Sequence, residues 1–292
     1  MYLALRAIAA LASALPERFL TPLARSLGWL CFVLCGYRRK VIADNLGVAL
    51  PELKGSAKRE LEREIHTHLA LTFLEFLRLP SYARKGFDSI FTATGLEHHQ
   101  AAKRAGRGIL AVSGHLGSWE LVVSAIARAL PNDVVHVVVK SFPKGVQALV
   151  DRHRSAGGVR SISSKDSMSQ ILGALRRNEV VVIVLDQNAT RHQGEFVPFF
   201  GKPACTMTGL AMLAMRTGAV VLPCAGHRRD DGRHVLEVFP PLSTERVGSR
   251  RETAIRITAE ATQFLERQIR SHPAQWLWTH KRWRTQPEPR GC

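Results

Sequence analysis

The sequence predicts an α/β fold with a mostly parallel or mixed central sheet covered by helices on both faces. Two observations lead to this prediction. Short runs rich in valine and isoleucine recur along the chain, and stretches with helical spacing separate them. Strands buried on both faces are continuously apolar, and parallel strands need crossover helices of about 10–15 residues. An apolar stretch precedes this pattern and predicts an additional N-terminal helical segment.

The first 40 residues are expected to form a membrane-associating segment. Residues 1–15 carry one arginine, and residues 19–37 are again mostly apolar before the basic cluster Arg38-Arg39-Lys40. A spanning helix needs about 20 mainly apolar residues, and Pro22 and Arg25 weaken this stretch as a span. We therefore expect an interfacial or single shallow anchor whose basic flank lies among anionic headgroups. The alternatives are core-packing helices that never touch lipid and a secretory signal.

The remaining elements follow in order along a single α/β domain, residues 41–292, with a helical lead-in to about residue 94. Residues 56–78 predict an amphipathic helix that ends at Pro80, with a linker near 80–94. The last two strands are expected to pair as a hairpin across Asp230-Asp231-Gly232. Strands are predicted at 108–113, 134–140, 180–185, 219–225 and 233–239. Helices are predicted at 96–105, 118–130, 144–155, 166–177, 207–217 and 250–271.

Composition narrows the possible partners. Hydrophobic residues make up 46% of the 292 residues and charged residues 22%, which excludes a disordered chain. The net charge of +17 favours an anionic partner: nucleic acid, acidic lipid, a phosphorylated substrate or an acidic carrier protein. The five cysteines are odd in number and contain no CxxC pair, so we expect them to be reduced in a protein that faces the cytosol.

A histidine and a glutamate form the first candidate site. In Ser113-Gly-His115-Leu-Gly-Ser-Trp-Glu120 the histidine directly follows a predicted strand. On one helix this spacing would turn the two side chains about 140° apart, so His115 must lie on the turn and Glu120 on the next helix. Ligands of such sheets bind outside the carboxyl ends of the strands. Glu120 would accept a hydrogen bond from one ring nitrogen, which leaves the other to act as a base.

Two glycines favour this arrangement, but the motif alone leaves alternatives. Gly114 and Gly117 allow a tight turn and the close approach of a substrate. The HxxxxE spacing also fits a structural turn histidine with an unrelated glutamate. A zinc hydrolase using His115, Glu120 and Asp186 is a further reading, although no second histidine lies close in sequence. The positive charge by itself would also fit a nucleic-acid-binding protein.

Several motifs in a fixed order carry a resemblance to a known family. They are Arg38-Arg39-Lys40-Val-Ile-Ala-Asp-Asn45-Leu, His115-Leu-Gly-Ser-Trp-Glu120, Leu185-Asp186-Gln187-Asn188, Phe196-Val-Pro-Phe-Phe-Gly201-Lys-Pro-Ala-Cys-Thr206 and Gln275-Trp-Leu-Trp278-Thr-His280-Lys-Arg-Trp. Over nearly its whole length the chain resembles the bacterial late lipid A acyltransferases (lauroyl and myristoyl transferases) of the lysophospholipid acyltransferase superfamily.

The resemblance implies roles for individual residues. His115 is implied as the general base that deprotonates the acceptor hydroxyl, and Glu120 as its partner. Arg152 and Asp186 match an arginine and an aspartate of the family's site. The implied substrate-binding residues are Gly114, Gly117, Lys140, Gln187 and Gly201. Lys140 stands where many relatives have arginine, and a lysine binds phosphate as a point charge rather than through two parallel bonds.

The resemblance also implies a reaction and its setting. The implied reaction moves an acyl chain from acyl carrier protein, or alternatively coenzyme A, to a hydroxyl of a lipid A precursor at the cytoplasmic face of the bacterial inner membrane. Neither a metal nor a cofactor is implied, and nucleic acid is not an expected partner. An acidic carrier and a phosphorylated lipid acceptor both suit the charge of +17. Related enzymes acylate other glycolipids, so a different lipid acceptor is the alternative.

Overall fold

The computed structural model describes residues 2–130, 133–139, 142–163 and 167–288. Within these ranges seven strands form one mixed sheet in the order β1-β9-β8-β2-β5-β3-β4. The sheet strands are β1 (Phe91–Thr94), β2 (Ile109–Ser113), β3 (Val135–Val139), β4 (Val159–Ser163), β5 (Val180–Val184), β8 (Val220–Arg228) and β9 (His234–Val238). The central strands pair in parallel, whereas β8 and β9 pair antiparallel in the predicted hairpin.

Helices cover both faces of the sheet, as predicted. Alternate residues of β2 belong to different cores: Ile109 and Ala111 pack with α6, while Leu110 and Val112 pack with α8, α9 and α10. Both faces of the strand are therefore apolar, which explains its continuous hydrophobic sequence. The helices around the sheet are α5 (Leu96–Arg104), α6 (Trp119–Ala129), α7 (Lys144–Ala156), α8 (Ser167–Arg176), α9 (Gly209–Thr217) and α10 (Arg250–Ser271).

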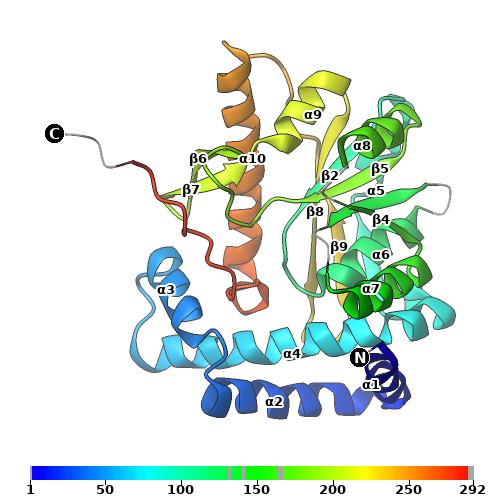
Figure 1. The fold of residues 1–292 in the computed structure, drawn as a ribbon, viewed down its shortest axis with the longest axis vertical. Helices are drawn as coiled ribbons and strands as arrows, with labels where there is room; N and C mark the ends of the chain where they lie inside the picture. The colour runs from blue at the N-terminus through cyan, green and yellow to red at the C-terminus, as the bar shows by residue number, and fades with distance from the viewer. Residues whose placement is uncertain (1, 131–132, 140–141, 164–166, 289–292) are drawn as a thin grey trace.

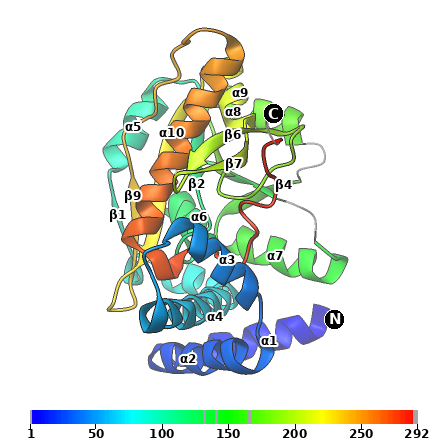
Figure 2. The ribbon, with the colours of Figure 1, turned by 90° about the vertical axis from the view of Figure 1, so that its left-hand side faces the viewer.

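Helix α4 (Gly55–Lys85) lies across one end of the sheet, and the N-terminal helices pack beneath it (Figure 1). These are α1 (Tyr2–Ala14) and α2 (Leu20–Leu30), and Figure 2 shows both on the side of α4 that faces away from the sheet. Arg78 of α4 is fully buried, and its guanidinium donates to the carbonyl oxygens of Ala12 and Leu15. Cations stabilise the carbonyl end of a helix, so Arg78 fixes the end of α1 on α4.

A third core lies away from the sheet and joins distant parts of the sequence. It contains Ile42 and Leu46 of α3 (Arg39–Ala49), Leu116 after β2, and Trp276 and Trp278 near the C-terminus. The hairpin of β6 (Gly194–Phe199) and β7 (Lys202–Met207) adds two phenylalanines to this aromatic cluster. This core therefore joins segments from four of the five motifs, which the sheet alone would leave apart.

Some sequence predictions were wrong. Strands β1, β4, β6 and β7 were missed: β1 and β4 are short edge strands, and β6 and β7 each contain a proline and pair with each other outside the main sheet. Pro80 was expected to end the helix, and a linker was expected after it. Instead α4 continues to Lys85. A helical proline forfeits one backbone hydrogen bond, and the burial of Leu79 and Tyr82 offsets that cost.

The close packing of α2 on α4 gives a test of the fold. A Cβ atom on Gly28 would lie 2.7 Å from the main-chain nitrogen of Thr67, whereas one on Gly47 of α3 would meet nothing within 4 Å. We expect Gly28→Ala to force the two helices apart and lower the melting temperature by several degrees, since overpacking costs about 1–3 kcal/mol. Gly47→Ala is the matched control and should be neutral or stabilising. Equal melting temperatures for the two variants would contradict the packing described.

Candidate active site

The turn after β2 carries the histidine that the sequence singled out. His115 is partly buried, and its imidazole nitrogen Nδ1 lies 2.8 Å from Oδ1 of Asp186. Asp186 closely follows β5, and β5 pairs directly with β2 so that Ser113 lies beside Val184. Adjacent parallel strands end at the same edge of a sheet, which is why the two side chains meet although 71 positions separate them.

The carboxylate of Asp186 is buried and fully engaged. Its Oδ2 accepts hydrogen bonds of 2.7 Å from the main-chain N–H of His115 and from the indole N–H of Trp276. Burial alone would raise the pKa of this carboxyl group. The charge of His115 and these hydrogen bonds outweigh burial and lower the pKa to about 2. Asp186 is therefore an ionised acceptor at neutral pH.

An ionised carboxylate fixes the tautomer of the imidazole. Because a carboxylate can only accept, Nδ1 of a neutral His115 must carry the proton. The lone pair then resides on Nε2, which lies 3.5 Å from the side-chain nitrogen of Gln187. The His115 ring also packs against the Trp119 ring in a T-shaped arrangement, with ring centroids 5.3 Å apart. The imidazole is thus held in a single orientation, which is what general-base catalysis would require of it.

The predicted hydrogen bond between His115 and Glu120 is replaced by a different pair. Both oxygens of Glu120 accept from Arg154, at 2.9 Å from Nε and 2.6 Å from Nη2. Glu120 lies in the first turn of α6 and faces α7, whereas Asp186 approaches the imidazole from the neighbouring strand. The expectation that Glu120 orients the imidazole was therefore wrong, although its catalytic role stays a prediction.

The arginine that reaches this region is Arg154 and not Arg152. Arg152 lies on the exposed face of α7, while Arg154 is buried two residues further on. Residues two apart on a helix point in directions about 160° different, so only one of them can face α6. The sequence motif Asp-Arg-His-Arg-Ser contains both arginines, one on each side of the buried His153. Both are one position away from His153, so the sequence alone does not indicate which of them faces α6.

The two glycines of the turn allow its backbone to pack closely against neighbouring parts of the protein. A Cβ atom on Gly114 would lie 3.1 Å from the Leu265 side chain and 3.4 Å from Asp186. Gly117 has a positive φ of 58°, and a Cβ atom there would lie 2.7 Å from the carbonyl oxygen of Gly226 in β8. These contacts explain the need for glycine without a ligand.

The other predicted binding residues fall in different places. Gln187 lies beside His115. Gly201 occupies the exposed turn between β6 and β7, where an added Cβ atom would meet nothing within 4 Å. Lys140 lies outside the described residues. Among the residues that the structure describes, no cluster of three or more His, Cys, Asp or Glu side chains is placed to hold a metal ion.

Sequence reasoning gave the C-terminal motif no role in the site, yet this motif contacts the candidate base directly. We call residues 275–278 the C-terminal strap. Its residue Leu277 donates its main-chain N–H to the carbonyl oxygen of His115 at 3.0 Å, and its Gln275 carbonyl accepts from Gly117 at 3.0 Å. The side chain of Asn45 donates to the carbonyl oxygens of Trp278 and His280, both at 2.7 Å. The order of the motifs in the sequence was the one available signal that these segments act together.

Comparisons with known proteins agree with one another. Residues 1–285 match the family model of bacterial lipid A biosynthesis acyltransferases. The lipid A biosynthesis lauroyltransferase of Escherichia coli K12 is 25% identical over 279 residues, which cover 94% of this chain and 88% of that protein. The lipid A biosynthesis palmitoleoyltransferase of the same strain is 24% identical, covering 86% and 80%. The phosphatidylinositol mannoside acyltransferase of Mycobacterium tuberculosis H37Rv is 29% identical, covering 65% and 58%.

Among solved structures, the 1-acyl-sn-glycerophosphate acyltransferase PlsC of Thermotoga maritima is similar to this chain. The sequence identity is 15% and the TM-score is 0.37, with 89% of this chain and 97% of that chain covered.

The two arginines of α7 provide a test of the site geometry. Replacement of Arg154 by methionine leaves the partly buried Glu120 without its partner, which we expect to destabilise the fold by about 3 kcal/mol. Arg152→Met changes an exposed side chain on the same helix and should stay within about 0.5 kcal/mol of the wild type. Denaturant unfolding of both variants measures the difference. An Arg152→Met variant as unstable as Arg154→Met would contradict the assignment of the pair.

Proposed function

The chain belongs to the family of bacterial lipid A biosynthesis acyltransferases, and we propose that it moves a fatty acyl chain from an acyl carrier protein thioester to a hydroxyl group of a lipid A precursor or related glycolipid. It is an acyltransferase, and acyl transfer to an acceptor resembling lipid A follows from its family. The single observation that supports the chemistry is the 2.8 Å hydrogen bond between His115 and Asp186. The donor, the precise acceptor and the residue roles are our proposals.

In the proposed reaction His115 acts as the general base. Its Nε2 takes the proton of the acceptor hydroxyl while the oxygen forms a bond to the thioester carbonyl carbon. The tetrahedral oxyanion then collapses, the carbon–sulfur bond breaks, and the leaving thiolate receives the proton from the imidazolium. Asp186 stays ionised throughout, so it stabilises the imidazolium and keeps the ring in one orientation.

We assign the oxyanion to Arg154 rather than to the turn. The main-chain N–H groups of His115, Leu116 and Gly117 already donate to Asp186, Gly114 and Gln275, respectively. Arg154, in contrast, has a buried Nη1 that lacks a hydrogen-bond partner among the described residues. Glu120 holds that guanidinium in place through two bonds. A preorganised donor of this kind stabilises charge that develops in the transition state.

The net charge of the chain suits an acidic carrier protein as the donor. The chain carries a net charge of +17, which attracts an acidic protein over long distances and also suits an acceptor with phosphate groups. The similarity to mycobacterial phosphatidylinositol mannoside acyltransferases makes a phosphorylated glycolipid of another class the second candidate acceptor. We set aside the nucleic-acid and zinc-hydrolase interpretations of the sequence, because the family match covers residues 1–285 and with them the His115 motif.

We propose that α1 and α2 lie in the plane of the inner membrane at its cytoplasmic face. Residues Glu17–Cys35 are long and apolar enough to cross a membrane by length and composition alone. However, α2 packs along α4 through Leu20, Ala24 and Gly28. A detached span would give up these contacts. Outside this packing, α1, α2 and the π-helical segment Cys31–Cys35 that follows expose Leu11, Leu23, Trp29, Leu30 and Leu34. These side chains suit insertion into the headgroup region of an anionic leaflet.

The reaction is tested with the purified protein and a lipid A precursor. An acyl carrier protein thioester should add one acyl chain to the lipid by mass spectrometry, at a higher rate than the corresponding acyl-coenzyme A. His115→Ala should abolish turnover, and Asp186→Asn should lower kcat by about 10³–10⁴, as loss of the orienting aspartate does in catalytic triads. His192→Ala, on an exposed turn, is the control. Turnover of His115→Ala within about tenfold of the wild type would remove the proposed base.

The membrane orientation is tested by flotation with vesicles that contain phosphatidylglycerol. Leu30→Asp combined with Leu34→Asp should weaken binding at least tenfold, because each buried leucine contributes about 1.5–3 kcal/mol. Val247→Asp is the control, since Val247 is similarly exposed but lies outside α1 and α2. If the double variant binds the vesicles as well as the wild type does, the proposal that α1 and α2 lie in the membrane plane is contradicted. Protease accessibility of the N-terminus from the periplasmic side would instead indicate a span.

A further inference from the structure

The C-terminal strap is built into the turn that carries the proposed base. Leu116 and Trp276 form an antiparallel bridge, flanked by the hydrogen bonds that Leu277 and Gln275 make to His115 and Gly117. The backbone of His115 is therefore held by a segment far away in the sequence. A displacement of the strap would displace the imidazole with it.

Trp276 adds a side-chain contact to these main-chain ones. Its indole N–H donates to Oδ2 of Asp186 at 2.7 Å, and Trp276 and Asp186 are each 3% exposed. Hydrogen bonds to an ionised acceptor are roughly twice as strong as those between neutral groups, more so where water is excluded. Trp276 thus holds the oxygen opposite the one that binds the imidazole.

We propose that Trp276 is a positioning residue for acyl transfer, which acts through Asp186. Its indole N–H fixes the orientation of the carboxylate and partly compensates the negative charge that His115 interacts with. This proposal rests on the proposed role of His115 as the base. Loss of the indole N–H leaves the charge of Asp186 less compensated, so the imidazolium form of His115 becomes more favourable. A base that stays protonated up to a higher pH can accept a proton only above that pH.

The other charged groups near the pair set the background for this effect. Arg282 is fully buried, and its guanidinium interacts electrostatically with Asp186 while it donates to the carbonyl oxygen of Cys205. His280 accepts a hydrogen bond from the main chain of Asn188 at 3.0 Å. On the α6 side lies the ion pair of Glu120 and Arg154. None of these groups changes when the indole N–H is removed.

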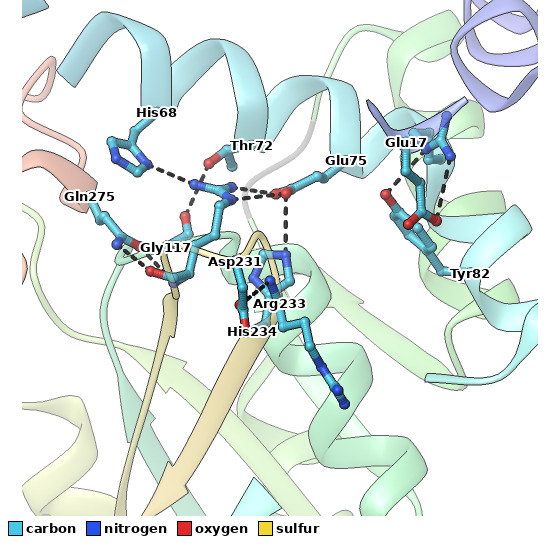
Figure 3. Close-up of polar contacts among 12 residues, drawn as sticks. Glu17, His68, Thr72, Glu75, Tyr82, Gly117, Asp231, Arg233, His234 and Gln275 are labelled. Atoms are coloured by element: carbon cyan, nitrogen blue, oxygen red, sulfur yellow. Dashed lines mark hydrogen bonds and ion pairs between the residues drawn. The ribbon is translucent and has the colours of Figure 1, made fainter. Parts of the chain in front are cut away.

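The strap and the turn that it contacts are anchored to α4 and β8, as Figure 3 shows. The side chain of Gln275 forms two 2.8 Å hydrogen bonds with the main chain of Arg228, and Thr72 donates to the carbonyl oxygen of Gly117 at 3.1 Å. The Arg228 guanidinium binds the buried carboxylate of Glu75 and the ring of His68. Because these anchors do not involve the indole, a change at Trp276 can leave the strap in place.

The neighbouring tryptophan supplies a matched control. Trp278 is also buried in the strap, and its indole N–H donates to the carbonyl oxygen of Pro273 at 2.6 Å. It belongs to the same aromatic cluster as Trp276, with ring centroids 4.7 Å apart. Phenylalanine at either position removes one indole N–H and a similar volume, but only the change at Trp276 removes a bond to Asp186.

The experiment compares wild type, Trp276→Phe and Trp278→Phe in the full-length protein. NMR of ¹⁵N-labelled histidine follows the titration of the His115 imidazole without any substrate, so its outcome is independent of the proposed acyl transfer. We expect Trp276→Phe to raise the midpoint by about half a pH unit or more, and Trp278→Phe to leave it unchanged. In the transfer assay, the acid limb of kcat should shift to higher pH for Trp276→Phe alone, with KM within about twofold.

Two outcomes would overturn the proposal. One is an unchanged His115 titration in Trp276→Phe, and the other is an equal shift in both variants, which would indicate a general effect of the aromatic cluster. If Trp276→Phe fails to fold, Trp276→Met serves instead, because methionine adapts to irregular space and also lacks the N–H. A wild-type protein that transfers no acyl chain, but whose titration shifts as expected, would refute the proposed function and leave the action of Trp276 on the His115–Asp186 pair intact.

Discussion

The buried carboxylate of Asp186 is the interaction on which the site depends. It receives the imidazole of His115, the main-chain N–H of the same residue and the indole of Trp276. The charge of His115 and these three hydrogen bonds outweigh burial, which by itself would raise the pKa of the carboxyl group. A protonated Asp186 would no longer fix the tautomer of His115. The strand pairing of β2 with β5 and the packing of the strap therefore serve one requirement, a charged carboxylate in a dry position.

The sequence predicts what depends on local pattern. Sequence periodicity located the central strands and most helices. The central strands were recognisable because strands buried on both faces are apolar at every position. The edge strand β4 has only two apolar residues among its five, Val159 and Ile162, and they do not alternate with polar ones, so it was missed. Pro80 was given too much weight, since helix propensity is local whereas the burial of Tyr82 depends on the tertiary structure.

The sequence named two members of the candidate site but did not predict that they pair with each other. His115 and Asp186 were both named, yet Glu120 was assigned to the imidazole because it lies close in sequence. Spatial proximity in a parallel sheet follows strand order, and strand order is a non-local property. Arg152 was named on the resemblance alone, whereas the structure places Arg154 on the helix face that meets α6. Trp276 had no predicted role in the site, since nothing local connects it to Asp186.

Helix α4 links the proposed membrane face to the turn that carries the proposed base. On one side it receives α2 at Gly28, and on the other its Thr72 binds the carbonyl of Gly117 in the turn after β2. A lipid hydroxyl is confined to a narrow depth at the surface of a bilayer, so a base that acts on it must be held at a matching height. With α1 and α2 in the membrane plane, the width of one packed helix sets that height. The buried pair of Glu75 and Arg228 then keeps α4 from moving relative to the sheet.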